Sequence, residues 1–139
     1  LFLRLFQCNN LLLRKAGQAL EKYGLTPQQW AVLGSLVREN GSPDLTVGEL
    51  AQTLRVSRQN IGAVIGRLER MGLLYKAEGT QDQRTKTVHL TEEGNRVWRD
   101  IEKPLLDFYN SVLTGCSIDD RARMLTELNN MLAQLERYD

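Results

Sequence analysis

The sequence is poor in the residues that stabilise small proteins covalently or through metal ions. Its 139 residues include two cysteines, Cys8 and Cys116, and one histidine, His89. Two cysteines are too few for a disulfide scaffold, and no CxxC pair accompanies them. We therefore expect no metal site, no cofactor, and a reducing compartment, the cytoplasm.

Long apolar runs and catalytic constellations are equally scarce. The apolar run over residues 1–6 is interrupted by Arg4 and followed by polar side chains, so it predicts neither a signal peptide nor a membrane span. An enzyme would need a nucleophile with its base, a metal triad or paired carboxylates in one cleft. The acidic pairs at 92–93 and 119–120 fall instead in expected first turns of helices, where the helix dipole favours carboxylates. We expect a protein without enzymatic activity.

The length and composition predict one globular domain over residues 1–139, because 42% of the residues are hydrophobic and 25% are charged. The net charge of +1 hides an uneven distribution. Residues 55–86 hold seven basic and three acidic groups, whereas residues 91–139 hold six basic and ten acidic groups. A polyanion-binding segment joined to a structural segment has this distribution, and a solvated surface with uneven charge explains it equally well.

Helical periodicity covers most of the chain, and its starts and ends carry recognisable signals. Thr26 with Gln29, and Thr46 with Glu49, have the spacing of capping boxes. Ser57 is a suitable N-cap for the best-defined apolar stripe, and Pro104 should bend the long helix that follows residue 91. We expect helices over residues 1–23, 26–40, 46–54, 57–71, 91–114 and 117–138.

Between the fourth and fifth helices, the pattern changes to two short strands. Residues 73–78 and 86–90 are strand-like, with Val88 and Leu90 on one face and Thr87 and His89 on the other. The loop between them, about seven residues long, exceeds the usual length of a hairpin loop. A short helix, a tight turn, a second helix and a hairpin predict a winged helix-turn-helix, a mainly α fold with a small β-hairpin wing.

The second helix of this motif has a small and basic outer face. Helical geometry places Gln59, Ala63, Gly66 and Arg70 opposite the apolar stripe, and Gly62 and Gly66 suggest a close approach to the helix backbone. The structural alternative is that residues 58–60 are only a polar first turn and that the two glycines only allow another helix to pack closely. If the helix enters DNA, the residues suited to base edges are Arg58, Gln59, Asn60, Ala63 and Arg67. The residues suited to phosphates are Ser57, Arg70, Lys76 and Lys86, and Arg67 is suited to that role as well.

Two motifs resemble the MarR family of bacterial transcriptional regulators. One is Asp82-x-Arg84-x-Lys86-x-Val88-x-Leu90-Thr91-x-x-Gly94, and the other runs from Val56-Ser57 to Leu68-Glu69-Arg70-Met71-Gly72-Leu73. The resemblance implies a homodimer joined through helices in residues 1–23 and 92–139, with a DNA-binding lobe over residues 26–90. It also implies that Arg84 reaches the minor groove, and that Asp82 holds the basic residues of the wing in place.

The same resemblance implies a repressor that binds a pseudo-palindromic site in double-stranded DNA and responds to a signal. Phe6, Tyr23 and Trp30 are candidates for lining a cleft for a small aromatic or anionic effector, although aromatics at helical spacing are more often core residues. Cys8 is a candidate oxidant sensor, although free cysteines are more often small buried hydrophobes. The rival interpretation is a winged-helix module that binds protein and not DNA.

Overall fold

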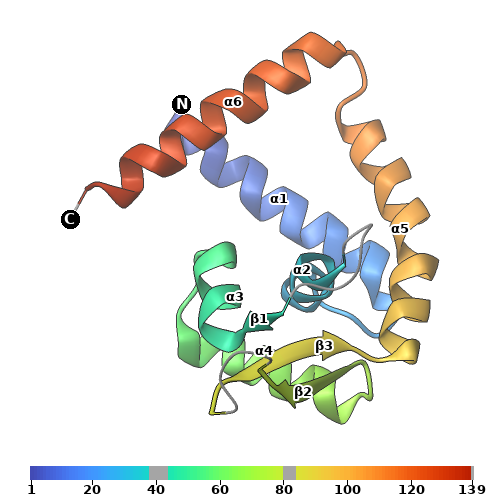
Figure 1. The fold of residues 1–139 in the computed structure, drawn as a ribbon. Coiled ribbons are helices and arrows are strands. Elements are labelled where there is room, and N and C mark those ends of the chain that lie inside the picture. The colour runs from blue at the N-terminus through green and yellow to red at the C-terminus, as the bar shows by residue number, and fades with distance from the viewer. Residues whose placement is uncertain (38–43, 80–83, 139) are drawn as a thin grey trace. The chain divides into compact units, whose positions relative to one another are not determined.

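The computed structural model describes residues 1–37, 44–79 and 84–138, and it forms two compact units, residues 1–106 and 107–139 (Figure 1). The division neither supports nor contradicts one functional domain, so that remains a prediction. The first unit holds α1 (Phe2–Glu21), α2 (Pro27–Leu36), β1 (Leu45–Thr46), α3 (Val47–Leu54), α4 (Arg58–Arg70), β2 (Leu74–Glu78), β3 (Lys86–Leu90) and most of α5 (Glu92–Val112). The second holds the end of α5 and α6 (Ile118–Glu136).

The predicted capping residues start their helices. The hydroxyl of Thr26 accepts the N–H of Gln29 at 3.2 Å, and the side chain of Gln29 accepts the N–H of Thr26 at 2.9 Å. Thr46 and Glu49 form the same reciprocal pair at the start of α3. These bonds satisfy N–H groups that have no partner within the helix, so the local sequence fixes where the helices begin.

The sheet has three strands in the order β1-β3-β2, so the prediction of a two-stranded hairpin was incomplete. Leu45 pairs with Val88, and Thr46 pairs with Thr87, in an antiparallel register. A strand of two residues is too short for any periodicity, which explains why the sequence did not reveal it. The expectation that Thr87 faces outward was also wrong, because Thr87 lies in the central strand of the sheet and its side chain is buried.

The core of the lobe lies where α2, α3 and α4 pack together against the sheet (Figure 1). Its fully buried side chains are those of Leu33, Leu36, Leu50, Ile65, Leu68 and Val88. Leu20 of α1 and Ile101 of α5 are also fully buried, so both helices share in the core of the first unit. Burying a side chain of this size stabilises the fold by about 1.5–3 kcal/mol.

Two helices of the described chain, one in each unit, expose apolar side chains. On α1 and its N-cap, Leu1, the exposed residues include Leu1, Phe2, Leu3, Phe6, Leu11 and Leu13. In the second unit α6 has no buried residue, and its exposed residues include Met124, Leu125, Leu128, Leu132 and Leu135. None of the described helices is long and apolar enough to cross a membrane.

Candidate nucleic-acid interface

The start of α4 is exposed and polar. Ser57 caps the helix by accepting the N–H of Asn60 at 3.1 Å, and the side chains of Arg58, Gln59 and Asn60 are exposed. The turn before the cap passes through Arg55, whose φ of 55° lies in the left-handed region and ends α3 sharply. The three polar side chains therefore project from the first turn of a helix whose direction the preceding turn fixes.

The remainder of α4 has two contrasting faces. Ile61, Ile65 and Leu68 are buried in the core, whereas Ala63, Arg67 and Arg70 are exposed on the opposite side. This is the arrangement that helical geometry predicts. A Cβ at Gly62 would meet no atom within 4 Å, so nothing in the described chain requires glycine there. That absence of a steric requirement is consistent with glycine serving the approach of an external molecule to the helix backbone.

The outer face of α4 is also one wall of a groove that the sequence did not reveal. The groove encloses about 860 Å³ between α4, the start of α2 and the middle of α1. From α1 it is lined by Leu13 and Arg14, and from α2 by residues 26–29. The helical spacing of apolar residues in α1 gives no sign that Arg14 lines a groove beside α4, because only the folded chain brings these helices together.

The wing contains the other predicted contacts with DNA. Lys76 of β2 lies 3.3 Å from the carboxylate of Glu69, so the wing and α4 are joined by an ion pair. The side chains of Arg84 and Lys86 are exposed at the end of the hairpin where the loop begins. Asp82, the predicted support of the wing, lies outside the described residues. Lys76 would therefore have to contact a phosphate while its ammonium group is already paired with the carboxylate of Glu69.

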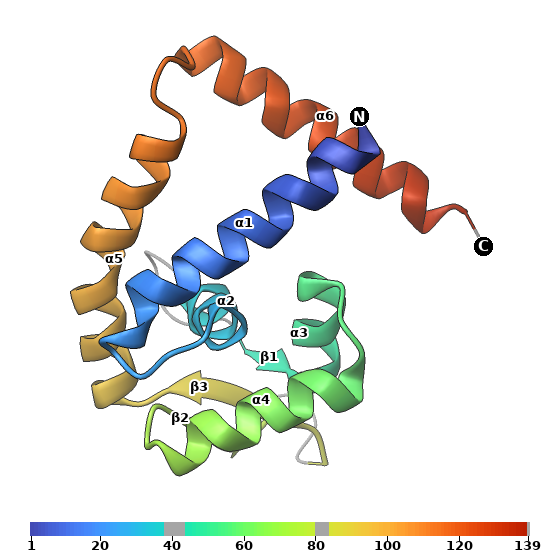
Figure 2. The ribbon, with the colours of Figure 1, turned by 180° about the vertical axis from the view of Figure 1, so that it is seen from behind.

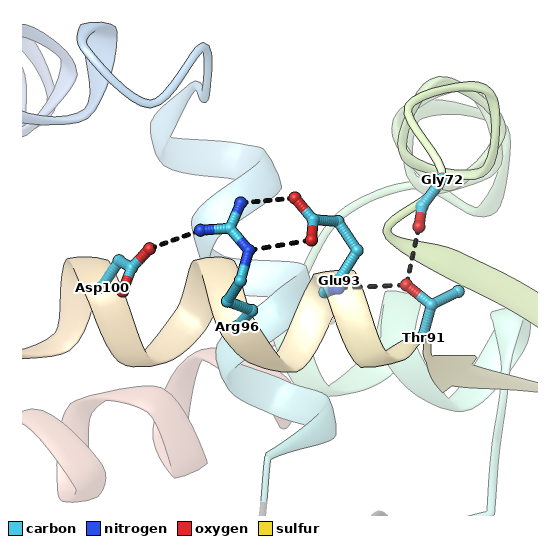
Figure 3. Close-up of polar contacts among 6 residues, drawn as sticks. Gly72, Thr91, Glu93, Arg96 and Asp100 are labelled. Carbon is cyan, nitrogen blue, oxygen red and sulfur yellow. Dashed lines mark hydrogen bonds and ion pairs between the residues drawn. The ribbon is translucent and has the colours of Figure 1, made fainter.

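Polar contacts at the start of α5 join that helix to the turn after α4 and continue along its first turns (Figure 3). The hydroxyl of Thr91 donates to the carbonyl oxygen of Gly72 at 2.6 Å and accepts the N–H of Gly94 at 3.0 Å. One turn further along, Arg96 joins Glu93 and Asp100, with its Nη1 at 2.8 Å from the carboxylate of Asp100. The hydrogen bond from Arg96 lowers the pKa of Glu93.

The three aromatic residues predicted to line an effector cleft do not share one environment. Tyr23 donates its hydroxyl to the carbonyl oxygen of Asp100 at 3.1 Å, and Trp30 stacks on Trp98 with ring centroids 6.4 Å apart. Both residues therefore contact α5, whereas Phe6 is 64% exposed on α1. The thiol of Cys8 is free and exposed, and Cys116 is also a free thiol.

Sequence comparison assigns the chain to a family. A model described as the MarR family matches residues 23–85. The "Transcriptional activatory protein BadR" of Rhodopseudomonas palustris is 41% identical over 140 residues, which cover 100% of this chain and 80% of that protein. The chain belongs to the MarR family. The "HTH-type transcriptional repressor MdtR" of Bacillus subtilis is 33% identical over 100 residues, which cover 70% of this chain and 63% of that protein.

Solved structures of MarR regulators have the same fold. The S. aureus MepR–DNA complex contains a chain that superposes with a TM-score of 0.83 at 25% sequence identity, covering 94% of each chain. The prediction of a winged helix-turn-helix transcriptional regulator is therefore confirmed. The roles of the individual site residues remain predictions.

Proposed function

We propose that this MarR regulator binds double-stranded DNA by inserting α4 into the major groove, with the wing reaching the adjacent minor groove. The observation that carries the proposal is the exposed polar first turn of α4, followed by a basic outer face, in a fold similar to a MepR chain bound to DNA. Arg58, Gln59, Asn60, Ala63 and Arg67 would face base edges. Ser57, Arg70, Lys76 and Lys86 would face phosphates, and Arg84 would enter the minor groove.

The exposed apolar residues of α1 and α6 support a homodimer. Monomeric soluble proteins rarely expose apolar stripes of this extent, and a two-fold axis would bury the same surface of each subunit. A dimer would place its two copies of α4 in successive major grooves of a pseudo-palindromic operator, with half-sites roughly 34 Å apart. Since chromosomal DNA is the target, the protein would act in the cytoplasm.

Occupation of an operator near the start of transcription would exclude polymerase, which makes repression the principal candidate for regulation. MdtR, a relative at 33% identity, is named a repressor. Activation is the second candidate because BadR, a relative at 41% identity, is named an activatory protein. A reporter driven by the bound promoter distinguishes them: deleting the regulator raises expression in the first case and lowers it in the second.

A small aromatic or anionic effector is the proposed signal, acting where α1 and α2 meet α5. Tyr23 and Trp30 both contact α5 there, and the buried N–H of Trp98 has no acceptor within the described residues. An anionic ligand would satisfy that donor and shift the equilibrium toward a state with lower affinity for DNA. Oxidation of the exposed Cys8 is an alternative signal, which a Cys8→Ser variant would no longer transmit.

Fluorescence anisotropy tests the DNA-binding proposal directly. The purified protein is titrated, across a range of salt concentrations, against labelled fragments from the promoter region of its own gene. We expect one fragment to bind far more tightly than the others, with affinity that falls steeply as salt rises. Arg58→Gln should weaken that complex, and Lys22→Gln, at the exposed end of α1, is the matched control. If the folded dimer prefers no fragment at any salt concentration, either a bound effector holds it in an inactive state or the fold serves protein contacts.

A further inference from the structure

The groove beside the recognition helix has an uncompensated positive charge. Its lining contains Arg14 from α1 and Arg67 and Arg70 from α4, and it contains no acidic residue. Within the described residues, none of these three guanidinium groups forms a salt bridge or a hydrogen bond. Arginines that line one cavity without carboxylates favour an anion there, because a bound negative charge offsets the repulsion between their guanidinium groups.

The start of α2 adds an independent donor to the same groove. The capping box uses the N–H groups of Thr26 and Gln29, and Pro27 has none, so the N–H of Gln28 remains for an external acceptor. The first turn of a helix also carries the positive end of the helix dipole. Three guanidinium groups and one backbone N–H, from three helices, therefore line this groove with positive charge.

The floor of the groove allows an anionic group to approach the α4 backbone. Gly62, Ala63 and Gly66 line it, and a Cβ at Gly66 would lie 3.6 Å from Nη1 of Arg70. The guanidinium group of Arg70 therefore lies back along the small residues of α4. A groove with small residues along α4 and basic side chains beside them accommodates a sugar-phosphate backbone that lies alongside the helix.

The open shape of the groove favours the backbone of a DNA strand over a small molecule enclosed by protein. Small-molecule sites commonly bury most of the surface of their ligand, whereas Leu13, Arg14, Thr26, Gln28, Arg67 and Arg70 all remain exposed around this groove. The groove is also continuous with the α4 face that carries the proposed contacts with bases. Figure 2 views the lobe from the side on which α1 and α4 lie.

We propose that this groove, lined by α1, α2 and α4, binds a phosphate group of the operator backbone, and that Arg14 is one of its ligands. The inference rests on the proposed DNA binding and extends the contact surface beyond the winged helix to α1. That helix would then have two functions, because its exposed apolar side chains serve the dimer while Arg14 contacts DNA. A change in the position of α1 would alter a DNA contact directly.

Paired neutralisations on α1 test the proposal. Arg14→Gln removes the cation in the groove, and Lys15→Gln removes the neighbouring exposed cation, which does not line the groove. Operator affinity is measured by anisotropy across salt concentration, after circular dichroism and light scattering have established the fold and the dimer. We expect Arg14→Gln to weaken binding about three- to tenfold and to reduce the slope of log affinity against log salt by about one. Lys15→Gln should change affinity by less than about twofold.

The outcomes separate this inference from the proposed function. Equal effects of Arg14→Gln and Lys15→Gln, or an unchanged salt slope for a folded dimeric Arg14→Gln variant, overturn the groove as a phosphate site while Arg58→Gln still tests DNA binding. Inorganic phosphate distinguishes the source of the anion. If millimolar phosphate stabilises the wild type but not Arg14→Gln, and Arg14→Gln leaves operator affinity intact, the groove binds free anions and the proposed contact with DNA is wrong.

Discussion

Thr91 donates its hydroxyl to the carbonyl oxygen of Gly72, so one hydrogen bond of 2.6 Å joins the end of the recognition helix to the start of α5. The N–H of Thr91 also donates to the carbonyl oxygen of Leu73 at 3.0 Å. Thr91 also caps α5, because its hydroxyl accepts the N–H of Gly94 (Figure 3). A single side chain therefore connects the turn after α4 to the first turn of α5. The orientation of α4 relative to the start of α5 is therefore fixed by polar contacts and not by apolar packing alone.

Replacing Thr91 with valine should destabilise the first unit. The variant keeps the shape of the side chain but leaves the N–H of Gly94 and the carbonyl of Gly72 without the hydroxyl that joins them. We expect a loss of about 1–2 kcal/mol in the free energy of unfolding, measured by urea denaturation. Thr91→Ser retains the hydroxyl and should recover most of that loss. A midpoint for Thr91→Val equal to that of the wild type would contradict the role assigned to the junction.

Gly94→Ala should be more damaging than its position in a helix suggests. A Cβ at this position would lie 2.2 Å from the carbonyl oxygen of Leu73, a backbone atom that cannot move without shifting the turn after α4. We expect destabilisation of roughly 1–3 kcal/mol in urea denaturation. Gly48→Ala in α3 is the control, because its Cβ would meet only the hydroxyl of Thr46 at 3.9 Å. That variant should be neutral or more stable than the wild type.

Gly62→Ala should separate folding stability from DNA binding. The new methyl group meets no described atom within 4 Å, so the gain in helix propensity should stabilise the protein by up to about 1 kcal/mol. The same methyl group would stand between the α4 backbone and DNA, so operator affinity should fall. Thermal denaturation and anisotropy on one preparation measure both effects. Unchanged affinity in the stabilised variant would show that DNA does not approach this glycine.

The wing and the recognition helix should differ in how their variants affect specificity. Arg84→Ala removes the proposed minor-groove contact and should weaken binding to the operator and to its single-base variants alike. Asn60→Ala removes a proposed base contact and should change the preference at particular base pairs, by about 1–3 kcal/mol at each. Anisotropy against a panel of single-base operator variants provides both measurements. A uniform loss for Asn60→Ala across that panel would remove Asn60 from the base-reading group.

The capping box of α3 should contribute to the acid sensitivity of the fold. Hydrogen bonds from the backbone and the side chain of Thr46 lower the pKa of Glu49 below its usual value. A carboxyl group whose pKa is lower in the folded state stabilises the fold above its unfolded-state pKa, and this contribution disappears as pH falls through the folded-state pKa. Urea midpoints between about pH 6 and pH 3 should therefore decrease less for Glu49→Gln than for the wild type. Parallel curves for the two proteins would show that Glu49 has no such role.

Local chemistry made the helix boundaries and the motif predictable. Ser57, Thr46 and Thr26 each cap a helix through atoms within three residues, so the sequence contains the whole interaction. The amphipathic face of α4 was predictable for the same reason, since its buried and exposed sides follow from the helical repeat. The strand β1 was not, because its two residues are ordered by pairing with residues more than forty positions away.

The sequence by itself determined the fold class, the family and the side chains available for DNA, because these depend on local propensities and on motifs of adjacent residues. Only the tertiary structure decided which surfaces those side chains form. The approach of Arg14 to the groove beside α4, the contact between Thr91 and Gly72 and the stacking of Trp30 on Trp98 all join distant parts of the chain. Such contacts arise when the core packs, and no spacing in the sequence records them.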